Sequence, residues 1–307
     1  MIPPRSQVRW RGFDRRAGLP VVAAVLVLCA PHSFAGKAPE LPPLTTISPA
    51  PRLPGKFVWA DLVTDDAVAA QRFYASLFGW TFQDMGGYLI ATMDERPVAG
   101  LFQRPRPEDK TAHPRWFGYI SVSSLSRAER AVTKAGGRVV APAKKFPKRG
   151  EQEVFADPEG VVFGVVKSSS GDPPDFKPEP GEWIWIQLMS RDGAKAAEFY
   201  RQIGDYEIIN NTSTNRLSDL VLTHNGFARA TVRTIPTGNE SVRPTWLLFL
   251  RVKNVAESVK QAAGLGGKVL IEPKADFLEG KVAIVEDPTG AAIGLLEWSL
   301  DLLKGGR

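Results

Sequence analysis

Gly136-Gly137-Arg138-Val139-Val140 and Asp157-Pro158-Glu159-Gly160 are the stretches that decide the fold, because both return 130 residues later. The later copies read Gly266-Gly267-Lys268-Val269-Leu270 and Asp287-Pro288-Thr289-Gly290. A third landmark, Phe73-Tyr74, returns 126 residues later as Phe199-Tyr200. Because the landmarks keep their order and nearly their spacing, the sequence predicts two copies of one domain that differ by a short insertion.

Hydrophobic periodicity predicts two βαβββ modules in each copy. In the first copy we expect strands at 57–63, 80–83, 88–93, 98–103, 116–122, 138–141, 153–156 and 161–167, with helices at 65–78 and 126–135. In the second copy, strands at 183–189 and 246–252 precede helices at 194–203 and 255–265, and each helix is followed by further strands. The predicted class is α+β, with mixed sheets curled around a cleft and covered by helices on one face.

The predicted domain boundaries follow from the repeats and from two proline-rich stretches. We expect a signal peptide at 1–35, a proline-rich linker at 36–54, a first domain at 55–168, a second linker at 169–181 and a second domain at 182–300. The 36–54 stretch should be extended and should not pack against the domains.

The N-terminus has the features of an export signal. Five arginines lie within an otherwise nearly uncharged start, an apolar run extends from Leu19 to Ala30, and Ser33-Phe34-Ala35 suits a signal peptidase. The apolar run is shorter than the roughly 20 residues that span a bilayer. We therefore expect an exported, periplasmic protein that begins near Gly36.

Three alternatives to signal-peptide cleavage stay open. Cys29 could be the lipidated residue of a lipoprotein, which would give a membrane anchor, although Leu28 is large for such a signal. Arg15-Arg16 fits a twin-arginine signal loosely. A mis-assigned start upstream of a cytosolic protein is the third alternative.

Charge and cysteine content exclude several function classes. The formal net charge is +6, but residues 1–36 carry five arginines against Asp14, so only +2 belongs to the rest of the chain. A nucleic-acid-binding surface is therefore not expected. Cys29 is the only cysteine, so disulfides, thiol catalysis and cysteine-ligated metals are not expected in the folded part. The charged run 144–149 is interpreted as a solvated loop, with an anion site as the alternative.

The repeated modules resemble those of a known superfamily. Paired βαβββ modules with Phe-Tyr near the helix end, a following Phe78-Gly79-Trp80 and an Asp-Pro-x-Gly turn are similar to the vicinal oxygen chelate superfamily, which includes glyoxalase I, bleomycin-resistance proteins and extradiol dioxygenases. The resemblance covers about residues 57–298. It is greatest to the tandem-domain, glyoxalase-like antigen branch, through Phe57-Val58-Trp59-Ala60-Asp61-Leu62 in the first strand.

The resemblance implies a divalent metal in each cleft, held by His, Gln or Glu from the first strands and by Glu from the last. At the matching positions this sequence has no metal-binding side chain: it has Trp59, Phe117 and Gly164 in the first copy and Trp185, Leu247 and Gly294 in the second. Glu297 lies on the opposite face from Gly294 by strand alternation. His113 and His224 read as surface histidines. We expect no metal and no cofactor.

Strand alternation instead predicts aromatic-walled clefts with a few polar groups. The candidate ligand-binding residues are Trp59, Asp61, Phe117, Tyr119, Trp185, Gln187, Phe249 and Arg251. Trp59 and Trp185 could also simply fill space. Asp61 is the candidate catalytic residue, and the alternative is that it is a structural partner of an arginine such as Arg115.

Three functions from different classes fit this sequence. The first is a metal-free, exported protein that binds a small molecule of unknown identity. The second is a lyase or isomerase that acts on a small carbonyl compound with Asp61 as general base. The third is a non-catalytic structural protein whose clefts are filled. The sequence does not decide whether the protein is an enzyme, and it does not predict an oligomeric state.

Overall fold

The computed structural model describes residues 40–47, 49–105, 113–211 and 219–298. The predicted export signal, with Cys29 and Gly36, lies outside the described residues. Within the part that is described, no helix combines the length and apolar character needed to cross a membrane.

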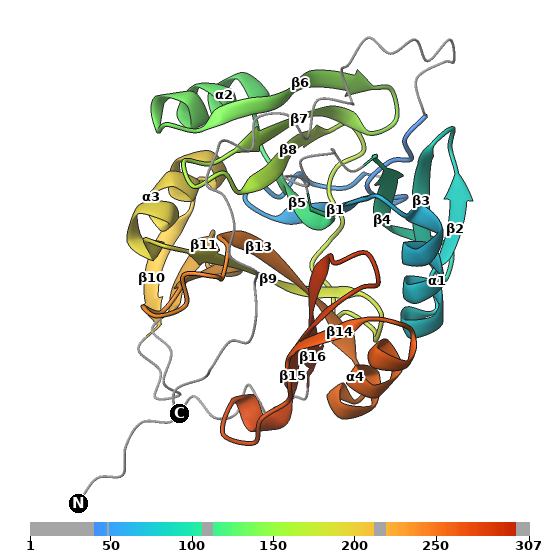
Figure 1. The fold of residues 1–307 in the computed structure, drawn as a ribbon. Helices are drawn as coiled ribbons and strands as arrows, with labels where there is room; N and C mark the ends of the chain where they lie inside the picture. Colours follow the sequence, from blue (N-terminus) through green and yellow to red (C-terminus); the bar gives the residue numbers. More distant parts are fainter. Residues whose placement is uncertain (1–39, 48, 106–112, 212–218, 299–307) are drawn as a thin grey trace, which may run out of the picture.

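The first half of the chain forms one mixed sheet of eight strands in the order β2-β3-β4-β1-β5-β8-β7-β6 (Figure 1). Each module supplies four neighbouring strands, and the first strands of the two modules pair antiparallel at the centre. The elements are β1 Phe57–Thr64, α1 Ala67–Phe78, β2 Thr81–Asp84, β3 Tyr88–Met93, β4 Arg96–Gln103, β5 Arg115–Ser121, α2 Leu125–Lys134, β6 Arg138–Phe146, β7 Gly150–Ala156 and β8 Val162–Ser168.

The second half repeats this sheet, in the order β10-β11-β12-β9-β13-β16-β15-β14. Its elements are β9 Trp183–Ser190, α3 Gly193–Gly204, β10 Glu207–Asn211, β11 Asp219–His224, β12 Phe227–Thr234, β13 Thr245–Val252, α4 Val255–Gly264, β14 Lys268–Ile271, a 3₁₀ turn at Leu278–Gly280, β15 Val282–Glu286 and β16 Ala292–Glu297. The predicted α+β fold of two tandem mixed sheets is confirmed.

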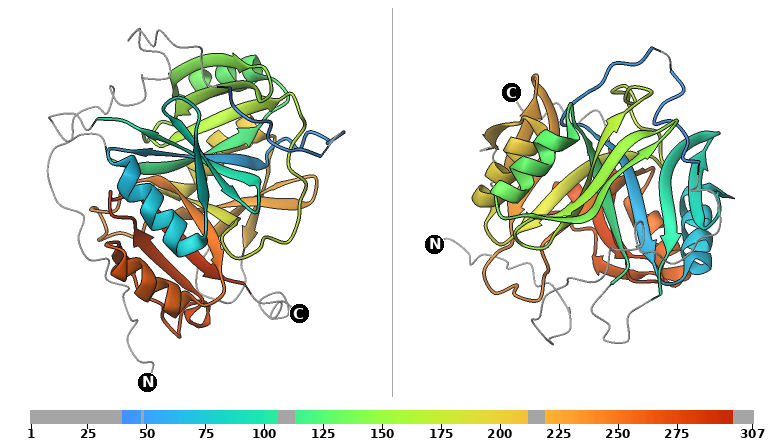
Figure 2. Two further views of the ribbon diagram at one scale, coloured as in Figure 1. Left: turned by 90° about the vertical axis from the view of Figure 1, so that its right-hand side faces the viewer. Right: turned by 90° about the horizontal axis from the view of Figure 1, so that it is seen from above.

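The two domains share one hydrophobic core. The core contains Leu62 and Ile120 from the first sheet together with Leu188 and Leu250 from the second. Helix α1 packs against α4, and α2 packs against α3, so each helix contacts a helix of the other domain (Figures 1 and 2). In both sheets, the helix-covered face therefore points toward the other domain.

Two reciprocal hydrogen bonds connect the repeated landmarks across this core. The Tyr74 hydroxyl, near the end of α1, donates to Asp287 Oδ2 of the second domain at 2.9 Å. The Tyr200 hydroxyl, near the end of α3, donates to Asp157 Oδ2 of the first domain at 3.1 Å. All four residues are buried. The helix-end tyrosine of each copy thus contacts the Asp-Pro-x-Gly turn of the other copy.

The proline-rich segment packs against the first domain, so the prediction of an unpacked linker is wrong for the described residues. Leu41 is 3% exposed and Leu44 is 6% exposed. Farther along, Arg52 Nε donates to the carbonyl of Ser168 at 2.9 Å. Proline content argued for an extended linker, but the two leucines between the prolines add enough apolar surface to pack.

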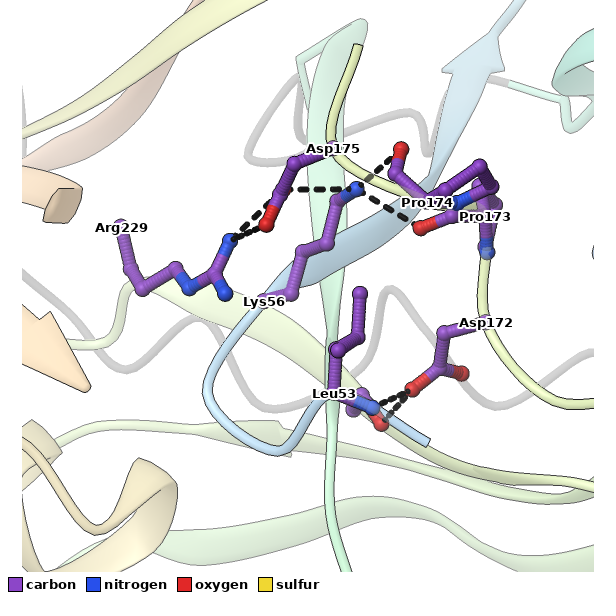
Figure 3. A network of polar contacts seen from close by, with 8 residues as sticks. Leu53, Lys56, Asp172, Pro173, Pro174, Asp175 and Arg229 are labelled. Carbon is purple, nitrogen blue, oxygen red and sulfur yellow. Dashed lines mark hydrogen bonds and ion pairs between the residues drawn. The ribbon is translucent and has the colours of Figure 1, made fainter. Parts of the chain in front are cut away.

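A polar network fixes the entry to β1 beside the segment that connects the domains (Figure 3). The backbone N–H of Leu53 donates to Asp172 Oδ2 at 2.5 Å. Lys56 Nζ lies 3.0 Å from Asp175 Oδ1, and Arg229 of β12 donates to the same carboxylate at 2.8 Å. Because one carboxylate binds a cation from each domain, this network holds both domains to the connecting segment.

Candidate functional site

Each sheet has a face that carries no helix, and the predicted cleft residues lie on these two faces. On the first sheet, Trp59, Phe117 and Tyr119 belong to one cluster of buried apolar side chains that is separate from the shared core. Strand alternation predicts this placement. Val58 departs from the prediction and joins the same cluster, because the pairing of β1 with β5 has an irregular register between Phe57 and Trp59.

Asp61 lies at the centre of the first helix-free face and accepts three hydrogen bonds. The Trp59 indole donates to Oδ1 at 2.8 Å, the Tyr88 hydroxyl to Oδ1 at 2.6 Å and the Tyr119 hydroxyl to Oδ2 at 2.8 Å. Burial raises the pKa of Asp61, while these donors and the charge of Arg149 lower it. The carboxylate is 1% exposed, so its hydrogen-bonding capacity is used inside the protein.

Arg149 is the cation beside this carboxylate, not Arg115 as the sequence suggested. Its guanidinium carbon lies 3.9 Å from the centre of the Trp59 ring, and the residue is 1% exposed. Burial lowers the pKa of Arg149, and the charge of Asp61 is among the groups that raise it. The prediction of a solvated loop at 144–149 holds for the exposed Lys145 and Lys148. It is wrong for Phe146, which ends β6 and is buried, and for Arg149.

The second helix-free face is less enclosed. Leu247 and Phe249 are buried on it, but Trp185 remains only partly buried, as do the apolar side chains around it, Ile184, Ile284 and Leu296. The Trp185 indole donates to Thr231 Oγ1 at 3.0 Å. Gln187 holds the place that Asp61 holds in the first domain and is 8% exposed. Apolar and aromatic surface with a few polar groups is therefore within reach of solvent on this face.

Arg251 lies at the edge of the second face. One of its guanidinium nitrogens donates to the carbonyl of Pro178 at 2.5 Å and lies 3.7 Å from the Glu179 carboxylate. Its guanidinium carbon is 5.6 Å from the centre of the Trp298 ring. Arg251 therefore connects this face to the segment between the domains.

The residues at the superfamily's metal positions do not fit a metal. A Cβ atom added to Gly164 would overlap the Tyr119 ring, and one added to Gly294 would overlap the Phe249 ring. A glutamate side chain therefore has no room at either position. Among the described residues, no three His, Cys, Asp or Glu side chains gather as a metal site requires. Glu297 instead accepts from the backbone N–H of Val255, at the start of α4 on the helix-covered face.

The structure brings most of the predicted residues together, in two separate groups. Trp59, Asp61, Phe117 and Tyr119 form the enclosed first group, and Trp185, Gln187, Phe249 and Arg251 surround the second face. Sequence reasoning missed Tyr88 and Arg149. Tyr88 and Ile90 lie two residues apart in a predicted strand, so strand alternation could have placed both side chains on one face of the sheet. Arg149 stood in a charged run that resembled solvated surface.

Known proteins resemble this chain in sequence and in fold. The family described as a glyoxalase-like domain matches residues 58–166. The Mycobacterium bovis protein named "Putative glyoxylase CFP32" is 27% identical over 259 residues, which cover 78% of this chain and 93% of that protein. The anthracycline biosynthesis protein DauV of Streptomyces is 29% identical over 260 residues, covering 80% of this chain and 94% of that protein.

Solved structures share the fold at low sequence identity. The Mn(II)-bound glyoxalase of Novosphingobium aromaticivorans has a TM-score of 0.52 at 15% identity, over 80% of this chain and 82% of that one. The 2,2',3-trihydroxybiphenyl 1,2-dioxygenase of Sphingomonas wittichii has a TM-score of 0.55 at 17% identity, over 81% of this chain and 94% of that one. Family match, relatives spanning both halves and shared fold together show that this chain belongs to the vicinal oxygen chelate superfamily, with two glyoxalase-like domains in tandem.

Proposed function

We propose that the protein binds a planar aromatic small molecule on the helix-free face of its second domain, without a metal. The observation that carries this proposal is the partly exposed Trp185 beside Phe249 and Gln187. The partly exposed Trp185 ring supplies stacking surface, and the Gln187 amide supplies both a donor and an acceptor. Such a combination is typical of small-molecule sites.

The names of two relatives support an aromatic ligand. DauV and DnrV, each 29% identical to this chain, are named for anthracycline biosynthesis. Anthracyclines contain a fused, planar ring system, which suits stacking on an indole. The comparison supports the class of ligand and leaves open whether this chain alters it chemically.

The lyase or isomerase hypothesis receives less support. It requires Asp61 to take a proton from a substrate, but Asp61 is 1% exposed and already accepts from three donors. A general base must come within hydrogen-bond reach of its substrate. We therefore propose a structural role for Asp61, with the first helix-free face filled from within the chain.

Binding of a hydroxyanthraquinone tests the proposed function. We expect saturable binding that survives EDTA, weakened at least about tenfold by Trp185→Leu, because removal of a stacking ring costs more than 1.4 kcal/mol at a central contact. Phe227→Leu is the matched control, since Phe227 is 56% exposed and lies outside this apolar cluster. Equal affinity of the Trp185→Leu protein and the wild type, measured by calorimetry, would reject this face as the site.

We also propose that the protein is exported to the periplasm. The proposal is supported by the arginine-rich start and the apolar run before Ser33-Phe34-Ala35. The intact mass of protein from its native host should correspond to a start near Gly36, or to a lipidated Cys29 if the lipoprotein alternative holds. A species that retains Met1 would contradict export.

A further inference from the structure

A short segment of the chain itself lies on the first helix-free face. We call residues 40–47 the strap. Its Leu41 and Leu44 are buried in the same cluster as Trp59, Phe117 and Tyr119. Ile47, three residues beyond Leu44, is 54% exposed. The buried contact therefore centres on two leucines that are separated by Pro42 and Pro43.

Side chains of the first domain also hold the backbone of the strap. Arg149 Nε donates to the carbonyl of Pro42 at 2.7 Å, while its guanidinium stacks on Trp59. The Leu44 N–H donates to Ser170 Oγ at 3.2 Å. Arg149 and Ser170 thus each form one hydrogen bond with the backbone of the strap, in addition to the apolar contact made by its leucines.

This combination resembles the sites at which proteins recognise proline-rich peptides, with leucines in place of prolines as the buried side chains. Proline restricts the backbone to extended conformations, so less entropy is lost on binding, and a proline-rich helix has three residues per turn. Side chains three apart then point to the same side, as Leu41 and Leu44 do here. Aromatic rings and a polar side chain directed at the peptide carbonyl complete such sites.

We propose that the first helix-free face is a binding site for an extended, proline-containing segment with leucines three residues apart, and that the strap occupies it as a tethered, displaceable ligand. The occupant is this chain's own N-terminal segment. A tethered ligand has an effective concentration on the order of millimolar. A free copy of the same segment should therefore compete poorly with the strap in the intact protein.

A labelled peptide with the sequence of residues 38–48 tests the site in the full chain. Leu41→Asp combined with Leu44→Asp should release the strap, and this variant should bind the peptide at least about tenfold more tightly than the wild type. Ile47→Asp is the control, because it places an aspartate in the strap at an exposed position. It should behave as the wild type does. A peptide with both leucines replaced by alanine should bind the double variant at least about tenfold more weakly.

Three results would overturn the proposal. The first is a folded double variant that does not bind the peptide. The second is a double variant that binds the leucine and alanine peptides equally. The third is a double variant that binds a hydroxyanthraquinone on this face in place of either peptide. If the double aspartate variant does not fold, Leu41→Ala combined with Leu44→Ala serves in its place, since it weakens the strap without burying charge. Hydroxyanthraquinone binding at Trp185 is measured separately, so the fate of this proposal is independent of the proposed function.

Discussion

At the residue scale, an aromatic ring from the neighbouring strand lies over each of the two glycines, Gly164 and Gly294, at which the superfamily resemblance implies a glutamate. Tyr119 pairs in register with Gly164, and Phe249 pairs with Gly294. Each ring occupies the space into which a side chain at the glycine would extend. In both copies, the ring and a side chain at the glycine therefore exclude each other.

Substitution of either glycine by alanine should destabilise the protein. Overlap of the new Cβ with a buried ring forces a shift that costs about 1–3 kcal/mol. Gly264→Ala is the control, because it lies in α4 with no neighbour within 4 Å of an added Cβ. Alanine there should be neutral or stabilising by up to about 1 kcal/mol. Denaturant unfolding measures all three variants, and a Gly164→Ala protein as stable as the wild type would contradict the packing described.

Asp61→Asn should lower the free energy of unfolding and leave binding of a hydroxyanthraquinone nearly unchanged. The amide loses the charge that Arg149 faces and gains a donor beside three groups that already donate. Loss of one charge from a buried pair costs about 3–5 kcal/mol. Asp94→Asn, in an exposed turn, is the control. Thermal unfolding with and without a hydroxyanthraquinone separates the roles: unchanged stability with lost binding would assign Asp61 to the ligand.

The sequence predicted only part of this arrangement. Strand alternation placed Trp59, Asp61, Phe117 and Tyr119 on one face, because a period of two is a local property of the chain. The approach of Arg149 to the ring of Trp59, whose indole donates to Asp61, depends on residues far apart in the sequence, so no local pattern predicts it. The position of Arg149, after three lysines and a phenylalanine, is equally compatible with solvent.

At the element scale, the reciprocal tyrosine bonds explain why two distant landmarks recur together. Tyr74 and Asp287 belong to different copies, as do Tyr200 and Asp157. The helix pairs α1 with α4 and α2 with α3 bring these groups into contact across the shared core. The order of strands and helices was predictable from periodicity. Contacts between the copies were not, because a sequence repeat does not indicate how the two domains pack against each other.

Tyr74→Phe and Tyr200→Phe should each weaken the contact between the domains. Each change removes a hydrogen bond to a buried carboxylate, which costs about 1.5–3 kcal/mol. Because the two bonds share no residue, the double variant should lose about the sum of the two costs. Tyr206→Phe removes another buried hydroxyl that joins the domains, but this one donates to the uncharged backbone carbonyl of Gly55, so its loss should cost less, about 0.5–1.5 kcal/mol. Wild-type stability of both single variants in urea would contradict the account.

At the scale of the whole molecule, the two halves share a fold and differ in what covers their helix-free faces. The strap encloses the first face, and apolar side chains on the second remain partly exposed. Internal duplication predicted the symmetry of the sheets. It could not predict this difference, because the strap lies outside the repeat and its proline content is typical of linkers. The helix-free face of the first domain is thus covered by the strap, and the helix-free face of the second domain remains partly open to solvent.

We propose that packed apolar groups stand at the superfamily's metal positions in both domains and leave no metal site there. Elemental analysis of protein purified from its native host, after dialysis, tests this claim most directly. The account predicts no stoichiometric zinc, nickel, manganese or iron, because the six positions are Trp59, Phe117, Gly164, Trp185, Leu247 and Gly294. About one retained metal ion per domain would contradict it.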